Sequence, residues 1–301
     1  MKSQKNQPLV SILVPCYNHQ KYIKTCLESL KNQDYGRIEL IIIDDGSTDS
    51  SYEIIKTWSI NNKNYFENLS HKKTINNGIT KTLSTLVNES NGEYIAFCAS
   101  DDKLDKASIT SRLKGFTSDN TAAVFGKAKL INGEDKILSD DAAKKLYGAN
   151  FKNKSGEQVV KELFFRWSLV GPVTMYRRSA IMKAGGIDTR YIAEDRSLFL
   201  RIIKQGDYSY IDEHVAEYRI HNKSITRNIS GRLIIPKDIA TLHVEQQFKF
   251  TGIRHLHLKS NRIDLTLMCK IENGNYLCLI PLLLFRVTRK LLVALYLKTS
   301  K

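Results

Sequence analysis

The chain has 301 residues, of which 42% are hydrophobic and 26% charged, a balance that is typical of folded globular proteins and excludes a disordered chain. Its formal net charge of +15 indicates an acidic partner, such as nucleic acid, anionic lipid or a phosphorylated small molecule. The five cysteines are scattered and form no C-x-x-C pair, which argues against a disulfide framework or a structural zinc site and favours a reducing compartment. Because the apolar run near the N-terminus is short, we predict no cleaved signal peptide and a cytoplasmic protein.

The first hundred residues alternate short apolar runs, which predict buried strands, with segments whose apolar residues recur at helical spacing. This alternation predicts an α/β fold with a single Rossmann-like sheet, mixed but mostly parallel, flanked by helices. In such sheets ligands bind beyond the carboxyl ends of the strands. Strands are predicted at residues 9–15, 38–44 and 92–100, and helices at 21–33, around 54–58 and at 78–90, the second helix being capped by Ser50 or Ser51.

The alternation continues to about residue 230, where long helical segments replace it. We therefore predict an α/β unit of residues 1–228 and a C-terminal helical extension of residues 229–301. Within the α/β unit we predict a strand at 121–131, a helix at 155–167, a strand, short helix and glycine turn at 171–188, a helix at 194–206 and two short strands at 208–221.

Two pairs of aspartates close predicted strands, Asp44 with Asp45 and Asp101 with Asp102. Adjacent carboxylates near buried strand ends repel each other, and a divalent cation or hydrogen-bond donors remove that penalty. The first pair alone is ordinary turn chemistry, because Asp-Gly-Ser sequences commonly form turns. Its repetition at a second strand end favours a site, and carboxylate ligands suit Mg²⁺ or Mn²⁺ bridging to phosphates.

The ordered segments VSILVPCYN, IELIIIDDGSTD and NGEYIAFCASDD, followed by ED at 194–195, resemble the family 2 inverting glycosyltransferases of the glycosyltransferase A-type fold, of the bacterial surface-polysaccharide type. The resemblance covers roughly residues 9–225. It implies that residues 1–228 are a nucleotide-sugar-binding catalytic domain, dependent on Mn²⁺ or Mg²⁺. The implied reaction moves a sugar from a nucleotide-diphosphate donor, expected to be a UDP-sugar, to a glycan or lipid-linked saccharide acceptor.

The same resemblance implies roles for individual residues. Asp45 matches the residue that accepts a hydrogen bond from the uracil ring, and Asp101 matches the last aspartate of the metal-binding Asp-x-Asp motif. Ala99 stands where that motif has its first aspartate, so Asp102 is expected to share the metal, which His221 also approaches. The nucleotide-binding residues implied are Pro15, Tyr17, Asn18, Asp44, Asp45, Asn77 and Ser100.

Asp195 matches the catalytic base of the family, with Glu194 beside it. The chemistry agrees, because an attacking hydroxyl needs a carboxylate to take its proton and a metal neutralises the leaving phosphates. An acidic first turn that balances a helix dipole would look the same in isolation. The residues expected beside the acceptor are Gly171, Pro172, Gly185 and Gly186.

Six further histidines lack metal-ligand spacing and are interpreted as surface or core residues. They are His19, His71, His214, His243, His255 and His257.

Residues 231–301 hold twelve lysines and arginines against four acidic residues, a net charge of +8. The apolar stretch near the C-terminus is interrupted by Arg286, Arg289 and Lys290, which fall on one helical face. Since central charges oppose a membrane span, we expect either an interfacial helix on anionic lipid at the inner face of the cell membrane or a helix packed on the catalytic domain. No nucleic-acid-binding motif is present, so nucleic acid is not an expected partner. A sugar nucleotidyltransferase and a non-catalytic glycan- or membrane-binding scaffold are the alternative functions.

Overall fold

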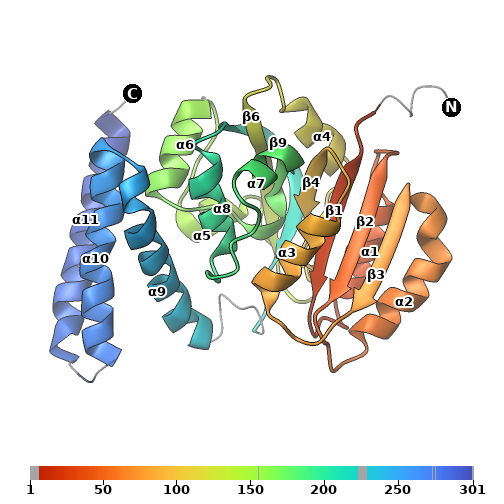
Figure 1. Ribbon diagram of the computed structural model, residues 1–301, viewed down its shortest axis with the longest axis horizontal. Coiled ribbons are helices and arrows are strands. Elements are labelled where there is room, and N and C mark those ends of the chain that lie inside the picture. The colour runs from red at the N-terminus through yellow and green to blue at the C-terminus, as the bar shows by residue number, and fades with distance from the viewer. Residues whose placement is uncertain (1–6, 155, 223–228, 273, 275, 300–301) are drawn as a thin grey trace.

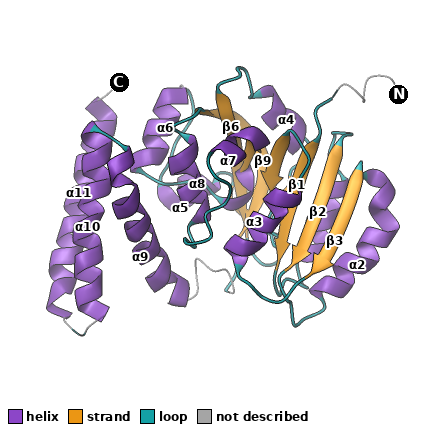
Figure 2. Ribbon diagram, viewed as in Figure 1, coloured by secondary structure: helices purple, strands orange, loops and turns teal. Residues whose placement is uncertain are grey.

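The computed structural model describes residues 7–154, 156–222, 229–272, 274 and 276–299, and within them nine strands form one sheet (Figures 1 and 2). The strand order is β3-β2-β1-β4-β8-β6-β9-β5, with β7 paired to β6. The strands are β1 (Val10–Cys16), β2 (Ile38–Asp44), β3 (Asn68–Lys73), β4 (Tyr94–Phe97), β5 (Lys103–Leu104), β6 (Thr121–Ile131), β7 (Ile137–Ser139), β8 (Thr174–Arg177) and β9 (Asp207–Arg219).

The strand directions bring the functional segments to one edge of the sheet. Strands β1 to β4 are parallel. Strand β8 is antiparallel to both β4 and β6, and β9 is parallel to β6, so β6 and β9 run in the same direction as β1 to β4. The carboxyl ends of β1, β2, β4 and β9 therefore share one edge, which we call the carboxyl rim and which lies at the bottom of Figure 2.

Helices cover both faces of the sheet, as expected for parallel strands. Figure 1 shows α3 in front of β1 and β2, with α1 and α2 on the opposite face. The crossovers reverse direction between β1 and β4, the kind of switch point at which such sheets bind ligands. The helices of the sheet region are α1 (Ile23–Lys31), α2 (Ser51–Asn62), α3 (Ile79–Glu89), α4 (Ser108–Lys114), α5 (Ala142–Tyr147), α6 (Gly156–Phe165), α7 (Arg178–Lys183) and α8 (Glu194–Ile202).

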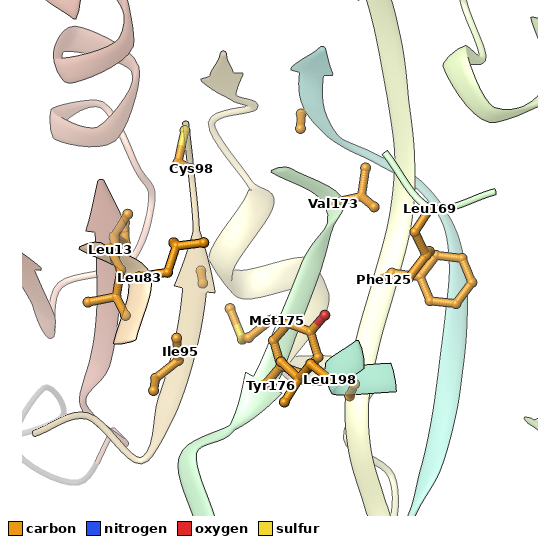
Figure 3. Close-up of a cluster of buried hydrophobic side chains, with 14 of the residues drawn as sticks. Leu13, Leu83, Ile95, Cys98, Phe125, Leu169, Val173, Met175, Tyr176 and Leu198 are labelled. Carbon is orange, nitrogen blue, oxygen red and sulfur yellow. The ribbon is translucent and has the colours of Figure 1, made fainter. Parts of the chain in front are cut away.

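The core is continuous across the parallel and antiparallel parts of the sheet. All seven residues of β1 and all seven of β2 are buried, which explains why these strands read as unbroken apolar runs. Figure 3 shows Leu13 and Ile95 on one side and Met175, Tyr176 and Leu198 on the other, in one cluster. This packing fixes the strand ends from which the site is built.

The predicted fold class, a mixed and mostly parallel sheet flanked by helices, is confirmed. Three local predictions differ from the structure. Strands β3, β5 and β7 were not predicted, and residues 207–219 form one strand with register shifts against β6 in place of two short strands. Ser50 lies at the start of α2 without a side-chain capping bond, and the Ser51 hydroxyl bonds Asp49 and the His19 amide. The predicted helix start at residue 155 lies outside the described residues.

Three long helices follow, as predicted: α9 (Ile229–Gln246), α10 (Gly252–Glu272) and α11 (Leu279–Thr299). Figure 1 shows α9 between the sheet region and the α10/α11 pair. The expected boundary at residue 228 ends a segment, 223–228, that lies outside the described residues, and the division into two domains stays a prediction. Among the described residues, none of the helices has the length and apolarity needed to cross a membrane.

Two of the three charges predicted on one face of α11 are directed toward α10, whereas Lys290 is exposed. Arg286 and Arg289 donate to the two carboxylate oxygens of Asp264 on α10, at 2.9 Å and 2.6 Å. Tyr296 packs its ring 5.1 Å from that of Phe165 on α6, so α11 is packed on the rest of the chain. Most of the exposed residues of α11 between Ile280 and Leu295 are aliphatic, with Thr288 and Lys290 among them.

Candidate active site

The loops after β1 and β2 are tied together at the carboxyl rim. Asn18 has a left-handed backbone, with φ of 54°, and its amide donates to the Ser47 hydroxyl at 2.8 Å. Its side-chain oxygen accepts from the Thr48 amide at 2.8 Å. Tyr17, beside it, is 45% exposed, and the carbonyl of Pro15 accepts from the Ser100 amide. These contacts place Pro15, Tyr17, Asn18 and Ser100 at one rim.

Backbone amides donate hydrogen bonds to the carboxylates of Asp44 and Asp45 and so reduce the repulsion between them. One oxygen of Asp44 accepts from the Ser47 amide at 2.8 Å, while its other oxygen is buried without a hydrogen-bond partner among the described residues. The two oxygens of Asp45 accept from the amides of Asn77 and Gly78, each at 2.9 Å. Asp45 thereby fixes the loop that carries Asn77 to the opening of the sheet. Among the described residues, this pair belongs to no group of possible metal ligands.

The second acidic segment meets two histidines. His221, just after β9, lies 2.9 Å from a carboxylate oxygen of Asp101, because β9 and β4 end at the same rim. His19, predicted to be a surface or core residue, lies in the same group, with Nδ1 at 3.8 Å from Asp101. One ligand atom from each of the three residues lies within 4.8 Å of the others. A carboxylate and imidazoles at this spacing fit a divalent cation.

Asp101 and Asp102 have different electrostatic environments. Burial acts to raise the pKa of Asp101, but the hydrogen bond from His221 and the nearby imidazoles hold it below its ordinary value. Burial and the charge of Asp101 raise the pKa of Asp102 well above its ordinary value, and one of its oxygens accepts from the Arg219 amide at 2.8 Å. Asp101 is therefore the ionised member, and Asp102, predicted as a metal ligand, lies outside the metal-ligand group.

A third pair of carboxylates, Glu194 and Asp195, begins α8. Glu194 and Asp195 are both half-buried, and Asp195 accepts from the Arg196 amide at 2.6 Å. Burial and the charge of Asp195 raise the pKa of Glu194 to about 8. Burial also raises the pKa of Asp195, while the amide and charge of Arg196 oppose this rise. Both carboxyls therefore hold their protons more tightly than free side chains do, and Asp195, beside the Arg196 amide and guanidinium, is the proposed proton acceptor.

Helix α9 holds the segment that leads into this pair. Asp238 accepts from the Ala193 amide at 2.8 Å, and Tyr191 donates to Glu245. The buried guanidinium of Arg196 donates to His243 at 3.0 Å. Sequence patterns give no sign of these contacts, because Asp238 and His243 lie 45 and 47 residues beyond their partners.

The four residues expected beside the acceptor separate into two places. Gly171 and Pro172 form a 3₁₀ turn before β8, and a Cβ at Gly171 would lie 3.4 Å from Asp102, so these two lie near the acidic segment. The carbonyls beside the other turn, at Ala184 and Gly186, accept from Arg201 on α8 at 2.6 Å and 2.7 Å. The same guanidinium donates to the Ser197 carbonyl at 3.2 Å. The turn at Gly185 and Gly186 is therefore tied to α8, and its place beside the acceptor stays a prediction.

Residues 11–185 match the family described as "Glycosyl transferase family 2", which is more than half of the chain. The chain belongs to glycosyltransferase family 2. The matched segment includes the loops after β1, β2 and β4, and the catalytic carboxylates proposed below follow it.

Curated relatives of this family 2 chain are glycosyltransferases by name. It is 27% identical over 242 residues to the Bacillus subtilis glycosyltransferase EpsH, covering 75% of this chain and 65% of EpsH. It is 24% identical to glycosyltransferase GlyA of Streptococcus pneumoniae, covering 72% of this chain and 31% of GlyA. The teichuronic acid biosynthesis glycosyltransferase TuaG of Bacillus subtilis is 26% identical, with 74% and 83% covered. The chain thus spans less than two thirds of the length of EpsH and GlyA.

Solved glycosyltransferase structures share the fold of this family 2 chain, which confirms the expected glycosyltransferase A-type fold. Residues 1–349 of Staphylococcus aureus TarS, in complex with UDP-GlcNAc, align with a TM-score of 0.63 and 19% identity, covering 86% of this chain and 72% of that one. The mannosyltransferase PcManGT from Pyrobaculum calidifontis, in complex with GDP-Man and Mn²⁺, aligns with a TM-score of 0.65 and 16% identity, covering 99% and 89%.

Proposed function

We propose that this chain is a metal-dependent inverting glycosyltransferase that uses a UDP-sugar to extend a glycan or lipid-linked saccharide in surface polysaccharide biosynthesis. The observation that carries the proposal is the contact of 2.9 Å between a carboxylate oxygen of Asp101 and His221 at the carboxyl rim, with His19 close by. TarS and PcManGT, which share the fold, were solved with a bound nucleotide sugar. The name of TuaG supports a role in cell-surface polysaccharides.

The residues divide the work of the reaction. Asp101 and His221 would hold the cation, which when bound neutralises charge on the diphosphate leaving group. Asp195 takes the proton of the acceptor hydroxyl. The hydroxyl oxygen bonds to the anomeric carbon while the bond from that carbon to the diphosphate oxygen breaks, and its electron pair leaves with the nucleoside diphosphate. Because the oxygen attacks the face opposite the leaving group, the configuration at the anomeric carbon inverts.

The test measures nucleoside diphosphate release from a panel of UDP- and GDP-sugars with Mn²⁺ and saccharide acceptors. Asp195→Asn should lower turnover about 10²- to 10⁴-fold, the usual contribution of a general base, while UDP binding by calorimetry stays unchanged. Asp212→Asn, an exposed carboxylate on β9, is the matched control and should keep native turnover. Release of pyrophosphate would replace the proposal with a nucleotidyltransferase, and the absence of any turnover or donor binding would favour a scaffold.

We also propose that the chain works at the inner face of the cell membrane, through an apolar surface on its C-terminal end. Eight aliphatic side chains there are each between 56% and 87% exposed, and large exposed apolar patches mark interaction surfaces. The basic charge of the C-terminal segment favours anionic lipid as the occupant, and the helix would lie in the interface without crossing it. This outer apolar face consists of Leu277, Ile280, Leu283, Leu284, Val287, Leu291, Leu292 and Leu295.

Vesicle flotation tests the membrane proposal. The native chain should float with phosphatidylglycerol vesicles more than with phosphatidylcholine vesicles, and the double variant Leu284→Gln/Leu291→Gln should remain in the dense fraction. Ile60→Gln, at a residue on α2 that is 64% exposed, is the control. Equal flotation of native and double-variant protein would refute the proposal. A dimer in sedimentation velocity that the double variant abolishes would assign the face to a second copy of the chain.

A further inference from the structure

We propose that His19 is a third metal ligand, which with Asp101 and His221 forms a two-histidine, one-carboxylate site that favours transition-metal dications over Mg²⁺. The inference rests on the proposed function, because it concerns the cation of that site. It assigns a residue that the Asp-x-Asp motif does not contain. It also predicts which divalent cation the site prefers.

The position of His19 is fixed by its backbone. Its amide donates to the Ser51 hydroxyl at 2.9 Å, and its carbonyl accepts from the amides of Tyr22 and Ile23, both at 2.9 Å, at the start of α1. The ring is directed to the end of β4, where Nδ1 lies 2.8 Å from the Ser100 hydroxyl and 3.8 Å from Asp101. A loop anchored on both sides therefore presents the imidazole to the acidic segment.

The imidazole lies where the motif has lost a ligand. Ala99 occupies the position of the first motif aspartate and has no metal-binding group. His19 approaches the same segment from a different loop and forms a group with Asp101 and His221 whose ligand atoms lie within 4.8 Å of one another. Metal bonds of about 2.1 Å place neighbouring ligand atoms about 3 Å apart. The Asp101–His221 separation of 2.9 Å already meets that value, and the His19 nitrogen, 3.8 Å from Asp101, would have to move closer when a cation binds.

Surrounding residues hold the three ligands in place. The Tyr22 ring lies 4.8 Å from the His221 ring and 6.1 Å from the His19 ring. The guanidinium of Arg219 lies 4.9 Å from the Tyr22 ring and donates to the Asp101 carbonyl at 2.6 Å. Such outer contacts orient metal ligands and raise affinity. Their presence around both histidines supports a built site over a chance meeting of side chains.

The ligand types decide the preferred metal. Mg²⁺ is held by oxygen ligands and water, whereas imidazole nitrogen favours first-row transition metals. With two imidazoles and one carboxylate, affinity should follow the order Co²⁺ above Mn²⁺ above Mg²⁺. A site of Asp101 and His221 alone would discriminate less, because it has one nitrogen ligand fewer.

The experiment titrates the full chain with MnCl₂ alone, and again with UDP present, following free Mn²⁺ by electron paramagnetic resonance. His19→Ala should weaken Mn²⁺ binding about 10- to 100-fold and reduce the preference over Mg²⁺, while His71→Ala, on β3, should leave both unchanged. His19→Asp should recover Mg²⁺ binding. Pulsed electron paramagnetic resonance spectra should show two imidazole nitrogens coupled to the bound Mn²⁺ in the native protein and one in His19→Ala.

The outcomes separate this inference from the proposed function. If native and His19→Ala proteins bind Mn²⁺ equally, with one coupled nitrogen in each, His19 is not a ligand, although a metal-dependent transferase still stands. If the native chain binds UDP and turns over equally well without any dication, the metal dependence of the proposed function fails, and the ligand assignment fails with it. If His19→Ala loses UDP binding even without metal, the residue acts on the nucleotide, and the inference is refuted.

Discussion

Replacing Asp238 tests whether α9 positions Glu194 and Asp195, the proposed catalytic carboxylates. The Asp238 carboxylate accepts from the amide of Ala193, the residue that precedes α8, at 2.8 Å. A hydrogen bond to a charged group contributes about 1.5–3 kcal/mol, whereas burial raises the pKa of Asp238 and so opposes its charged form. Since Asp238 is itself partly exposed, we expect Asp238→Ala to lower the free energy of unfolding by about 2 kcal/mol. Asp238→Asn keeps an acceptor oxygen and should cost about half as much.

The same change should reach catalysis. A displaced α8 start moves Asp195, and small misplacements of reacting groups cost large factors in rate. We expect Asp238→Ala to lower kcat about tenfold with an unchanged KM for the donor, and Asp238→Asn to restore most of it. Urea unfolding followed by circular dichroism measures the free energy of unfolding, and steady-state kinetics measure kcat and KM separately. Asp119→Ala, an exposed carboxylate between α4 and β6, is the control. If all three variants match the native protein in both assays, α9 does not position the pair.

Three further perturbations test the site and its frame. Because burial raises the pKa of Glu194 from 4.5 to about 8, its ionisation destabilises the folded state. Glu194→Gln should therefore be as stable as the native protein near pH 4.5, become increasingly more stable than it as the pH rises to about 8, and keep a constant difference in stability above pH 8. A difference in thermal unfolding that does not depend on pH would contradict this. Gly46→Ala places a Cβ 2.7 Å from the Asn76 amide at a φ of +78°, so the affinity for UDP, measured by calorimetry, should fall about tenfold. The control Gly148→Ala has a φ of +67° and open space around its Cβ, and it should lower stability without changing UDP affinity. Equal UDP affinity of the two variants would refute a role of the Gly46–Asn76 contact in UDP binding. Asp264→Leu leaves two arginines of α11 unpaired and should destabilise the α10/α11 pair by about 2 kcal/mol, seen as faster amide exchange in both helices; unchanged exchange would show that the ion pairs contribute little.

The sheet was predictable because its central strands are buried on both faces. Strands β1 and β2 are fully buried and so read as apolar runs, while β3 lies at the sheet edge with the polar sequence NLSHKK and none of its residues buried. An edge strand of this kind is defined by its pairing to β2, and its own composition does not distinguish it from a loop. The missed strand thus follows from where burial is complete and where it is not.

The sequence predicted which segments form the candidate site, but it did not predict which side chains within them contact one another. Adjacent aspartates at 101 and 102 look alike in the sequence, yet one meets His221 and the other the Arg219 amide, and only the path of the chain separates them. His19 was missed because Ser100 lies 81 residues away, so no local spacing connects the two. Likewise the grouping of basic residues in α11 followed from periodicity, but the direction of Arg286 and Arg289 depends on Asp264, 22 and 25 residues earlier.

The C-terminal helices connect the proposed membrane surface to the catalytic carboxylates through α9. An extension that served only to attach the chain would need no hydrogen bonds to the residues on either side of Glu194 and Asp195. Yet Asp238 bonds Ala193 on one side and His243 bonds Arg196 on the other. Figure 1 places α9 between the sheet region and the α10/α11 pair. The residues that contact Ala193 and Arg196 therefore lie on a helix between the proposed membrane surface and the proposed catalytic carboxylates.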